Sequence, residues 1–392
     1  MTGERMAGAT PEQIVQTAAA HYLAVSHAPG CCIAVYDQES FGDGGLVCPH
    51  GLVGVPGSGT PVVGVTADTV FEIGSVTKVF TSTLLGVAVQ AGGAWLTDTV
   101  QSWLDRNRKI VSTDLEGITL GQLATHTSGM PDQPKGLTDY SKPLFADLPP
   151  TPDIIAWWNS YDTPPPGCWQ YSNIGFVTLG FAVTQMFPLP GWQYDSILSA
   201  QVTGPLGMAR TGAVVDPTWL AARGTIGRWR SESGRFVFQG NVPTNDSAFD
   251  LKSTGNDMLA FLKAQIAPPD DLLGRAIALT QQRQGTFPVC ASGAAVRSGS
   301  VTMGLGWQIT TDTNGNAVYA KNGATSRGGF EAVVIFVPAL RCGVAVLSNQ
   351  YFDANAPHPA GIAPGATALL IIQKLHPGFA LAGPLPDRNA SD

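Results

Sequence analysis

Apolar residues recur at helical spacing near the start of the chain and then form strand-like runs. Thr10-Pro11 is typical of a helix start, with the threonine as N-cap and the proline at the first helical position. The apolar residues that follow at helical spacing are Ile14, Ala18, Tyr22 and Leu23. Residues 31–37 and 45–55 then indicate two strands divided by a Gly/Asp turn.

A second group of strand-like runs begins after about residue 300. It comprises residues 304–310, 317–321, 329–337 and 342–348. Asp312–Gly315 predicts a hairpin turn within this group, and a final helix is predicted from about 360 to 375. Between the two groups, from about 95 to 285, short helical patterns alternate with proline-rich loops. The uncharged stretch 79–97 contains polar side chains and a Gly-Gly stop, so it predicts a buried helix rather than a membrane span.

Strands at both ends with helices between them predict an α+β fold. We expect an antiparallel sheet built from both termini, flanked by the terminal helices, with a mostly helical inserted lobe. One catalytic domain would span 1–392, with an α/β lobe of about 12–80 plus 290–376, a helical lobe of about 81–289 and a tail from 377. A cleft between the lobes is the expected place for an active site.

Composition narrows the function classes. The 392 residues are 44% hydrophobic and 13% charged, which excludes a disordered chain. A net charge of −7 with 22 Lys plus Arg argues against a nucleic-acid-binding surface. No apolar signal segment is seen at the N-terminus, so a cytoplasmic location is predicted as written, or a periplasmic or secreted one if a signal was removed.

The six cysteines are too sparse for a disulfide scaffold. Neither CxxC nor HExxH occurs, so no metal and no cofactor are predicted. The cysteines are interpreted as small buried hydrophobic residues. Cys31 and Cys32 are adjacent in a strand-like run and should point to opposite faces of the sheet.

Ser75-Val76-Thr77-Lys78 is the first candidate for chemistry. If a helix begins at Ser75, the Lys78 amine lies beside the Ser75 hydroxyl, because residues three apart share a helix face. A serine hydroxyl needs such a neighbouring base to become a nucleophile. The alternative is a helix-start serine followed by a lysine whose amine reaches solvent.

Two more motifs carry candidate groups. Tyr171-Ser172-Asn173 precedes an apolar helix, and a phenol near lysines can accept and donate a proton. Lys321-Asn322-Gly323-Ala324 ends a strand-like run, where the lysine can hold a substrate carboxylate. The Ala324 and Ser75 N–H groups can form an oxyanion hole. The alternatives are a polar loop before a helix for the first motif and a hairpin turn for the second.

Together and in this order, the three motifs resemble the serine β-lactamase and penicillin-binding-protein superfamily. The match is to its class C branch, which also holds D-aminopeptidases, AmpH-like DD-peptidases and family VIII esterases. Further matching segments are 70–81 (VFEIGSVTKVFT), 118–129 (ITLGQLATHTSG), 166–175 (PG…YSNIG), 205–208 (PLGM) and 321–330 (KNG…GGF). The resemblance covers about residues 12–376 and implies the β-lactamase/transpeptidase-like fold.

The resemblance implies a role for each matching residue. Ser75 would be the acylated nucleophile, Lys78 and Tyr171 would share acid–base work, and Lys321 would act electrostatically. Asn173 would bind the substrate's side-chain amide. Gln133, Asn322, Gly323 and Asn349 would also contact substrate. His126, within the THTSG stretch, is expected to be structural.

Two departures from class C bear on the substrate, which is expected to be a small molecule. Asn322 stands where those enzymes carry threonine, and Thr325-Ser326-Arg327 lengthens the following turn. The leading hypothesis is hydrolysis of β-lactam amide bonds through an acyl-enzyme. The alternatives are an esterase or a D-amino-acid amidase or DD-peptidase on the same scaffold, and a penicillin-binding protein that deacylates slowly.

Overall fold

The computed structural model describes most of the chain. The described residues are 8–53, 62–104, 113–132, 152–161, 167–188, 194–213, 228–229, 236–237, 247–290, 299–325, 329–350 and 363–385. Within them, nine strands form one antiparallel sheet in the order β3-β2-β1-β13-β12-β11-β10-β9-β8. Their bounds are β1 Gly30–Asp37, β2 Leu46–Val53, β3 Val63–Gly64, β8 Gly285–Pro288, β9 Ser300–Met303, β10 Gln308–Thr311, β11 Ala317–Thr325, β12 Phe330–Val337 and β13 Cys342–Ser348.

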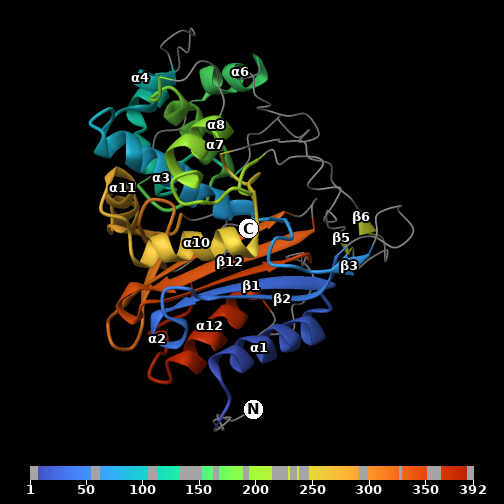
Figure 1. The fold of residues 1–392 in the computed structure, drawn as a ribbon. Helices are drawn as coiled ribbons and strands as arrows, with labels where there is room; N and C mark the ends of the chain where they lie inside the picture. Colours follow the sequence, from blue (N-terminus) through green and yellow to red (C-terminus); the bar gives the residue numbers. More distant parts are fainter. Residues whose placement is uncertain are drawn as a thin grey trace.

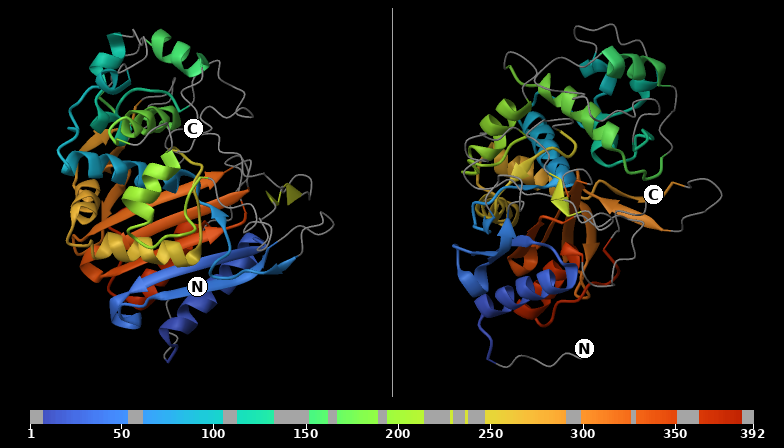
Figure 2. Two further views of the ribbon diagram at one scale, coloured as in Figure 1. Left: turned by 45° about the horizontal axis from the view of Figure 1, so that its top comes forward. Right: turned by 90° about the vertical axis from the view of Figure 1, so that its right-hand side faces the viewer.

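Helices cover both faces of this sheet (Figure 1). Helices α1 (Pro11–Ser26) and α12 (Pro364–Leu375) pack on one face, and α10 (Gly255–Ile266) packs on the other. Beyond α10 lie α3 (Thr77–Gln90), α11 (Leu272–Gln281) and the short helices of the middle of the chain, and the turned views in Figure 2 show the same layers. The helices of the middle of the chain are α4 Val100–Leu104, α5 Leu120–Ala124, α6 Pro152–Ser160, α7 Asn173–Thr184 and α8 Tyr194–Leu198.

Smaller elements complete the described fold. Strands β4 (Phe71–Glu72) and β7 (Lys252–Ser253) form one separate pair, and β5 (Arg228–Trp229) and β6 (Phe236–Val237) form another. Helix α2 (Gln38–Phe41) lies between β1 and β2, where the sequence predicted only a turn. Single 3-10 turns span Gly74–Val76, Thr113–Gly117 and Pro338–Leu340, and a π-helical turn spans Ser199–Thr203.

The α+β prediction is confirmed, with a sheet built from both ends of the chain. Helix α1 begins as expected, since Thr10 and Gln13 cap it reciprocally. Strands β8 and β9 escaped prediction because each has only four residues, too few for the alternation of Val301 and Met303 in β9 to stand out. No described helix combines the length and the apolar character that crossing a bilayer requires. The two-lobe division stays a prediction.

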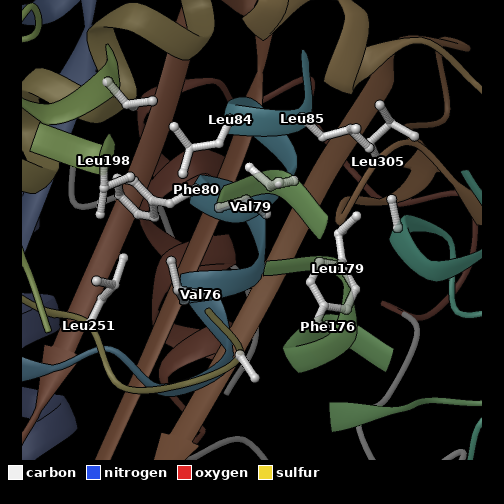
Figure 3. Close-up of a cluster of buried hydrophobic side chains, with 14 of the residues drawn as sticks. Val76, Val79, Phe80, Leu84, Leu85, Phe176, Leu179, Leu198, Leu251 and Leu305 are labelled. Atoms are coloured by element: carbon white, nitrogen blue, oxygen red, sulfur yellow. The ribbon is translucent and has the colours of Figure 1, made fainter. Parts of the chain in front are cut away.

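Helix α3 explains the long uncharged stretch of sequence. Its residues from Thr77 to Ala88 are all buried, so a charge on its surface would have to be paired inside the protein. Figure 3 shows apolar side chains of α3 packed among those of neighbouring elements. These neighbours include Phe176, Leu179, Leu198, Leu251 and Leu305. The segment that starts with Ser75 is therefore anchored in the core.

The cysteine prediction is right in part. Cys31 and Cys32 lie on opposite faces of β1, in the two separate apolar clusters. Cys168 and Cys290, however, form a disulfide across 122 residues, so their interpretation as free buried thiols is wrong. The physical reason is a long-range contact: the Trp169 N–H donates to Pro288 O at 2.7 Å, and the Cys290 N–H donates to Trp169 O at 2.9 Å.

Candidate active site

Ser75 lies in the 3-10 turn that joins β4 to α3. Gly74 supports the turn with a φ of 50°, and the Thr77 hydroxyl donates to its carbonyl at 2.7 Å. Lys78 follows one turn later, and its Nζ donates to Ser75 Oγ at 3.0 Å. The two side chains meet as the three-residue spacing predicted.

The Lys78 amine is completely buried and is surrounded by oxygen atoms. Besides Ser75 Oγ, it donates to Asn173 Oδ1 at 2.6 Å and to the Ala248 carbonyl at 2.9 Å. Three acceptors match the three N–H bonds of an ammonium group. These contacts offset the cost of burying the charge, which would be prohibitive without partners.

Tyr171 reaches the same serine from a different part of the chain. Its hydroxyl lies 2.5 Å from Ser75 Oγ. The Lys78 and Lys321 amines lie 4.9 and 5.2 Å from the centre of its ring. Tyr171 precedes α7, whose first turn is capped by Ser172 through a 2.8 Å bond from the Gly175 N–H. Two positive charges therefore flank the phenol.

Asn173 is held by a residue that the sequence analysis did not select. Its Nδ2 donates to Asp132 Oδ1 at 2.7 Å, while its backbone N–H donates to the Asp132 carbonyl at 3.1 Å. The Asn173 side chain is thus fixed with Oδ1 toward Lys78. The only signal for Asp132 was its place in the loop after the THTSG stretch, and that does not indicate which residue it contacts.

Strand β11 lies directly against the Ser75 turn. A Cβ atom on Gly323 would lie 2.1 Å from Ile73 O and 2.8 Å from Ser75 N, so only glycine fits there. A Cβ on Gly74 would lie 2.5 Å from Ala324 N. The backbone of β11 at Gly323 and Ala324 therefore lies in close contact with the Ser75 turn.

Two of the residues predicted to bind substrate are placed elsewhere. Asn322 shares the β11 face of Val318 and Ala320, because side chains alternate along a strand, and that face packs toward α1 and α12. Asn349 is buried, with Oδ1 accepting the Gly30 N–H at 2.7 Å and Nδ2 donating to Leu52 O at 3.3 Å. The Asn349 side chain thus uses both its amide oxygen and its amide nitrogen on backbone groups of the sheet. Gln133 lies outside the described residues, as do Ser326 and Arg327 of the longer turn.

One group of metal-type side chains lies apart from Ser75 in the described part of the chain. Asp37, Cys342 and His376 bring their ligand atoms within 4.8 Å of one another. The His376 Nε2 and Asp37 Oδ2 atoms contact each other directly as an ion pair, and Asp37 Oδ1 caps α2 by accepting the Ser40 N–H at 2.7 Å. The group is therefore accounted for as a structural tie between β1 and the end of α12.

Known proteins resemble this chain in sequence and in fold. The family model described as Beta-lactamase matches residues 17–363. A beta-lactamase of Escherichia coli (strain K12) is 28% identical over 338 residues, covering 76% of this chain and 79% of that protein. The D-alanyl-D-alanine-carboxypeptidase/endopeptidase AmpH of the same organism is 26% identical over 294 residues, covering 72% and 71%. A solved class C beta-lactamase superposes with a TM-score of 0.74 at 19% identity, covering 93% of this chain and 96% of that one.

Proposed function

This chain belongs to the beta-lactamase family and is a serine-β-lactamase-like hydrolase of small molecules; we propose that it opens β-lactam amide bonds through an acyl-enzyme on Ser75. The observation that carries the proposal is the convergence on one hydroxyl: Ser75 Oγ lies 2.5 Å from the Tyr171 hydroxyl and 3.0 Å from Lys78 Nζ. A serine in hydrogen-bond contact with a base and a cation is poised for nucleophilic attack.

The proton leaves Ser75 toward Tyr171. Lys78 uses its three N–H bonds on three acceptors, so it acts as an ammonium and Tyr171 supplies the accepting oxygen. Tyr171 accepts this proton as a phenolate, whose negative charge Lys78 and Lys321 stabilise before the transfer. Ser75 Oγ then attacks the carbonyl carbon, and the oxyanion is held by the Ser75 and Ala324 N–H groups.

Collapse of this tetrahedral species breaks the C–N bond. The departing nitrogen takes the proton from Tyr171, which leaves an ester on Ser75 and a phenolate ready for the second half of the cycle. The phenolate then accepts a proton from water, and the hydroxide formed attacks the ester. Tyr171 donates the proton that it took from water to Ser75 Oγ as the ester bond breaks. The ring-opened acid is then released.

A second candidate is an esterase or D-peptide hydrolase built on the same cluster. One observation favours it: Asn322 replaces the threonine of class C enzymes and lies on the β11 face that packs toward α1 and α12. On this face we expect the Asn322 side chain to point away from a β-lactam carboxylate bound beside Ser75. The similarity to AmpH is consistent with this candidate as well.

The deciding experiment compares nitrocefin and p-nitrophenyl butyrate turnover by the wild type, by Ser75→Ala and by Ser82→Ala. Ser82 is the matched control because it is an equally buried serine on α3. We expect nitrocefin hydrolysis that falls about 10³-fold or more in Ser75→Ala and persists in Ser82→Ala. Ester cleavage without nitrocefin cleavage would favour the second candidate. Labelling of Ser75 without turnover would indicate a slowly deacylating penicillin-binding protein.

A further inference from the structure

We infer that His126 is a positioning residue for Tyr171, which it holds as a neutral imidazole through hydrogen bonds to the residues on both sides of that tyrosine. The inference rests on the proposed function, because it concerns the group that accepts the Ser75 proton. It assigns a role in catalysis to a histidine that touches neither Ser75 nor the position of the substrate carbonyl.

The hydrogen bonds of His126 bracket Tyr171. The Gln170 N–H donates to the His126 carbonyl at 2.8 Å, and the Ser172 N–H donates to His126 Nδ1 at 3.1 Å. Between these two bonds, the imidazole ring lies against the phenol ring, with 4.6 Å between their centres. One residue thus fixes the backbone before Tyr171, the backbone after it and one side of its ring.

The backbone of His126 is shaped for this contact. Its φ is 60°, in the left-handed region that few residues other than glycine adopt, although Asn, Asp and His tolerate it better than most. The flanking residues secure the turn: the Thr125 hydroxyl donates to Gly121 O at 2.8 Å, and the Thr127 N–H donates to Gln122 O at 2.9 Å. Helix α5 therefore anchors the turn that presents the imidazole.

The geometry also fixes the charge and tautomer of the ring. Nδ1 accepts a hydrogen bond, so the proton must be on Nε2, which has no hydrogen-bond partner among the described residues. Burial, followed by the positive charges of Lys321 and Lys78, holds the pKa of His126 well below its usual value. The ionisable groups that face it are Lys78 from α3, Lys321 from β11 and Tyr171 itself.

Protonation of His126 would disrupt this arrangement. An Nδ1–H would point at the Ser172 N–H, so two donors would meet. A third positive charge would also be placed beside two ammonium groups. Tyr171 must keep its hydroxyl at hydrogen-bond distance from Ser75, and a displacement of about 1 Å is enough to lower a rate about 10²-fold.

The test distinguishes the role of the Nδ1 hydrogen-bond acceptor of His126 from the role of its ring. His126→Asn keeps an acceptor near the Nδ1 position and suits a positive φ. His126→Phe keeps the ring but lacks the acceptor, and His126→Gly suits the backbone but lacks both, so Gly replaces Phe if that variant does not fold. Thr178→Val is the control. It removes a hydroxyl that accepts the Trp158 indole N–H at 3.0 Å, and Thr178 is as buried as His126 but lies away from Ser75.

We expect kcat for nitrocefin, or for the ester if that is the better substrate, to stay within about 5-fold of wild type in His126→Asn. In His126→Phe and His126→Gly it should fall about 30-fold or more, with KM within about 3-fold and a shifted pH profile. Thr178→Val should lose thermal stability while its kcat stays near wild type. The inference is overturned if His126→Gly keeps its kcat, if His126→Asn is as damaged as His126→Gly, or if Thr178→Val loses as much kcat as His126→Gly.

A measurement on the unmodified protein keeps this inference separate from the proposed function. Nitrogen-15 chemical shifts of His126 should report a neutral Nε2–H tautomer from pH 5 to 8, whatever the substrate. Titration of His126 near its ordinary pKa of about 6.5 would refute the inference that neutral His126 positions Tyr171. Absence of Ser75-dependent turnover in the wild type would instead refute the proposed function.

Discussion

Strand β11 presents different chemistry on its two faces. Lys321 and Gly323 lie on the face that meets the Ser75 turn and Tyr171. Val318 and Ala320 lie on the opposite face, in the apolar cluster covered by α1 and α12. The first face holds buried charges and close backbone contacts, whereas the second resembles an ordinary protein core with one ion pair at its margin, between Asp37 and His376.

The register of β11 therefore decides which of its residues can reach Ser75. A shift of β11 by one residue would move Lys321 to the covered face and Asn322 to the catalytic one. Substitutions on the Ser75 face should therefore change the rate more than the stability. Substitutions on the α1/α12 face should change the stability and leave the rate nearly intact.

The largest contrast is expected between the neighbours Gly323 and Asn322. Gly323→Ala places a methyl group 2.1 Å from Ile73 O, which pushes β11 away from Ser75 and opens the oxyanion hole. We expect kcat to fall about 100-fold. Asn322→Ala, on the other face, should keep kcat within about 3-fold. Steady-state kinetics with melting temperatures measure both, and a larger kcat loss in Asn322→Ala would reverse the assignment of the faces.

A smaller effect is expected from Asp132, which acts through Asn173. Asp132→Ala removes the acceptor that fixes the Asn173 side chain, so Oδ1 of Asn173 is no longer held toward Lys78. We expect kcat to fall about 10-fold. Asp132→Asn retains an acceptor oxygen and should lose less. Equal kinetics in the two variants would mean that Asn173 keeps its place without Asp132.

The smallest effect is expected on the α1/α12 face, and it concerns stability alone. The hydrogen bond to Asp37 raises the pKa of His376. Burial alone would raise the pKa of Asp37, but hydrogen bonds, first that from His376, lower it below its usual value. The contribution of His376 to the stability of the fold is complete below about pH 6.5, and it is lost as pH rises through the raised pKa of His376. The contribution of Asp37 to the stability of the fold is complete above about pH 4, and it is lost as pH falls through the lowered pKa of Asp37.

The ion pair should therefore stabilise the fold most between about pH 4 and 6.5. His376→Gln removes the titrating charge, so the melting-temperature gap to wild type should be widest near pH 5.5. It should narrow toward pH 9 and below about pH 4. kcat at each pH should match wild type. A gap that does not vary with pH would show that the contact contributes packing rather than charge.

Local spacing was sufficient for one half of the cluster. Ser75 and Lys78 meet because they lie three residues apart in the same turn, and a helical pattern predicts such a contact. Tyr171 and Lys321 are 96 and 246 residues from Ser75 in the sequence, and only the family resemblance indicated that they join it. Asp132 and the Cys168–Cys290 disulfide depend on long-range contacts that no local pattern encodes.

Asn322 and Asn349 were predicted to contact substrate from the class C resemblance alone, and that role stays a prediction. The resemblance does not say which face of the sheet each side chain occupies, because a strand sends adjacent side chains to opposite faces. Asn349 uses its amide on Gly30 and Leu52, which the sequence places about 300 residues away. Alternation along 317–321, once anchored by the position of Lys321, would have indicated the face of Asn322.

The proposed function depends above all on the acylation of Ser75. The most direct test is intact-protein mass spectrometry of wild type and Ser75→Ala, quenched during turnover of a penicillin, with mapping of the modified peptide. Opening a β-lactam ring releases no leaving group, so we expect a gain of the whole penicillin mass on the peptide containing Ser75, and no gain in Ser75→Ala. Turnover with no adduct at any quench time, or an adduct on another residue, would contradict it.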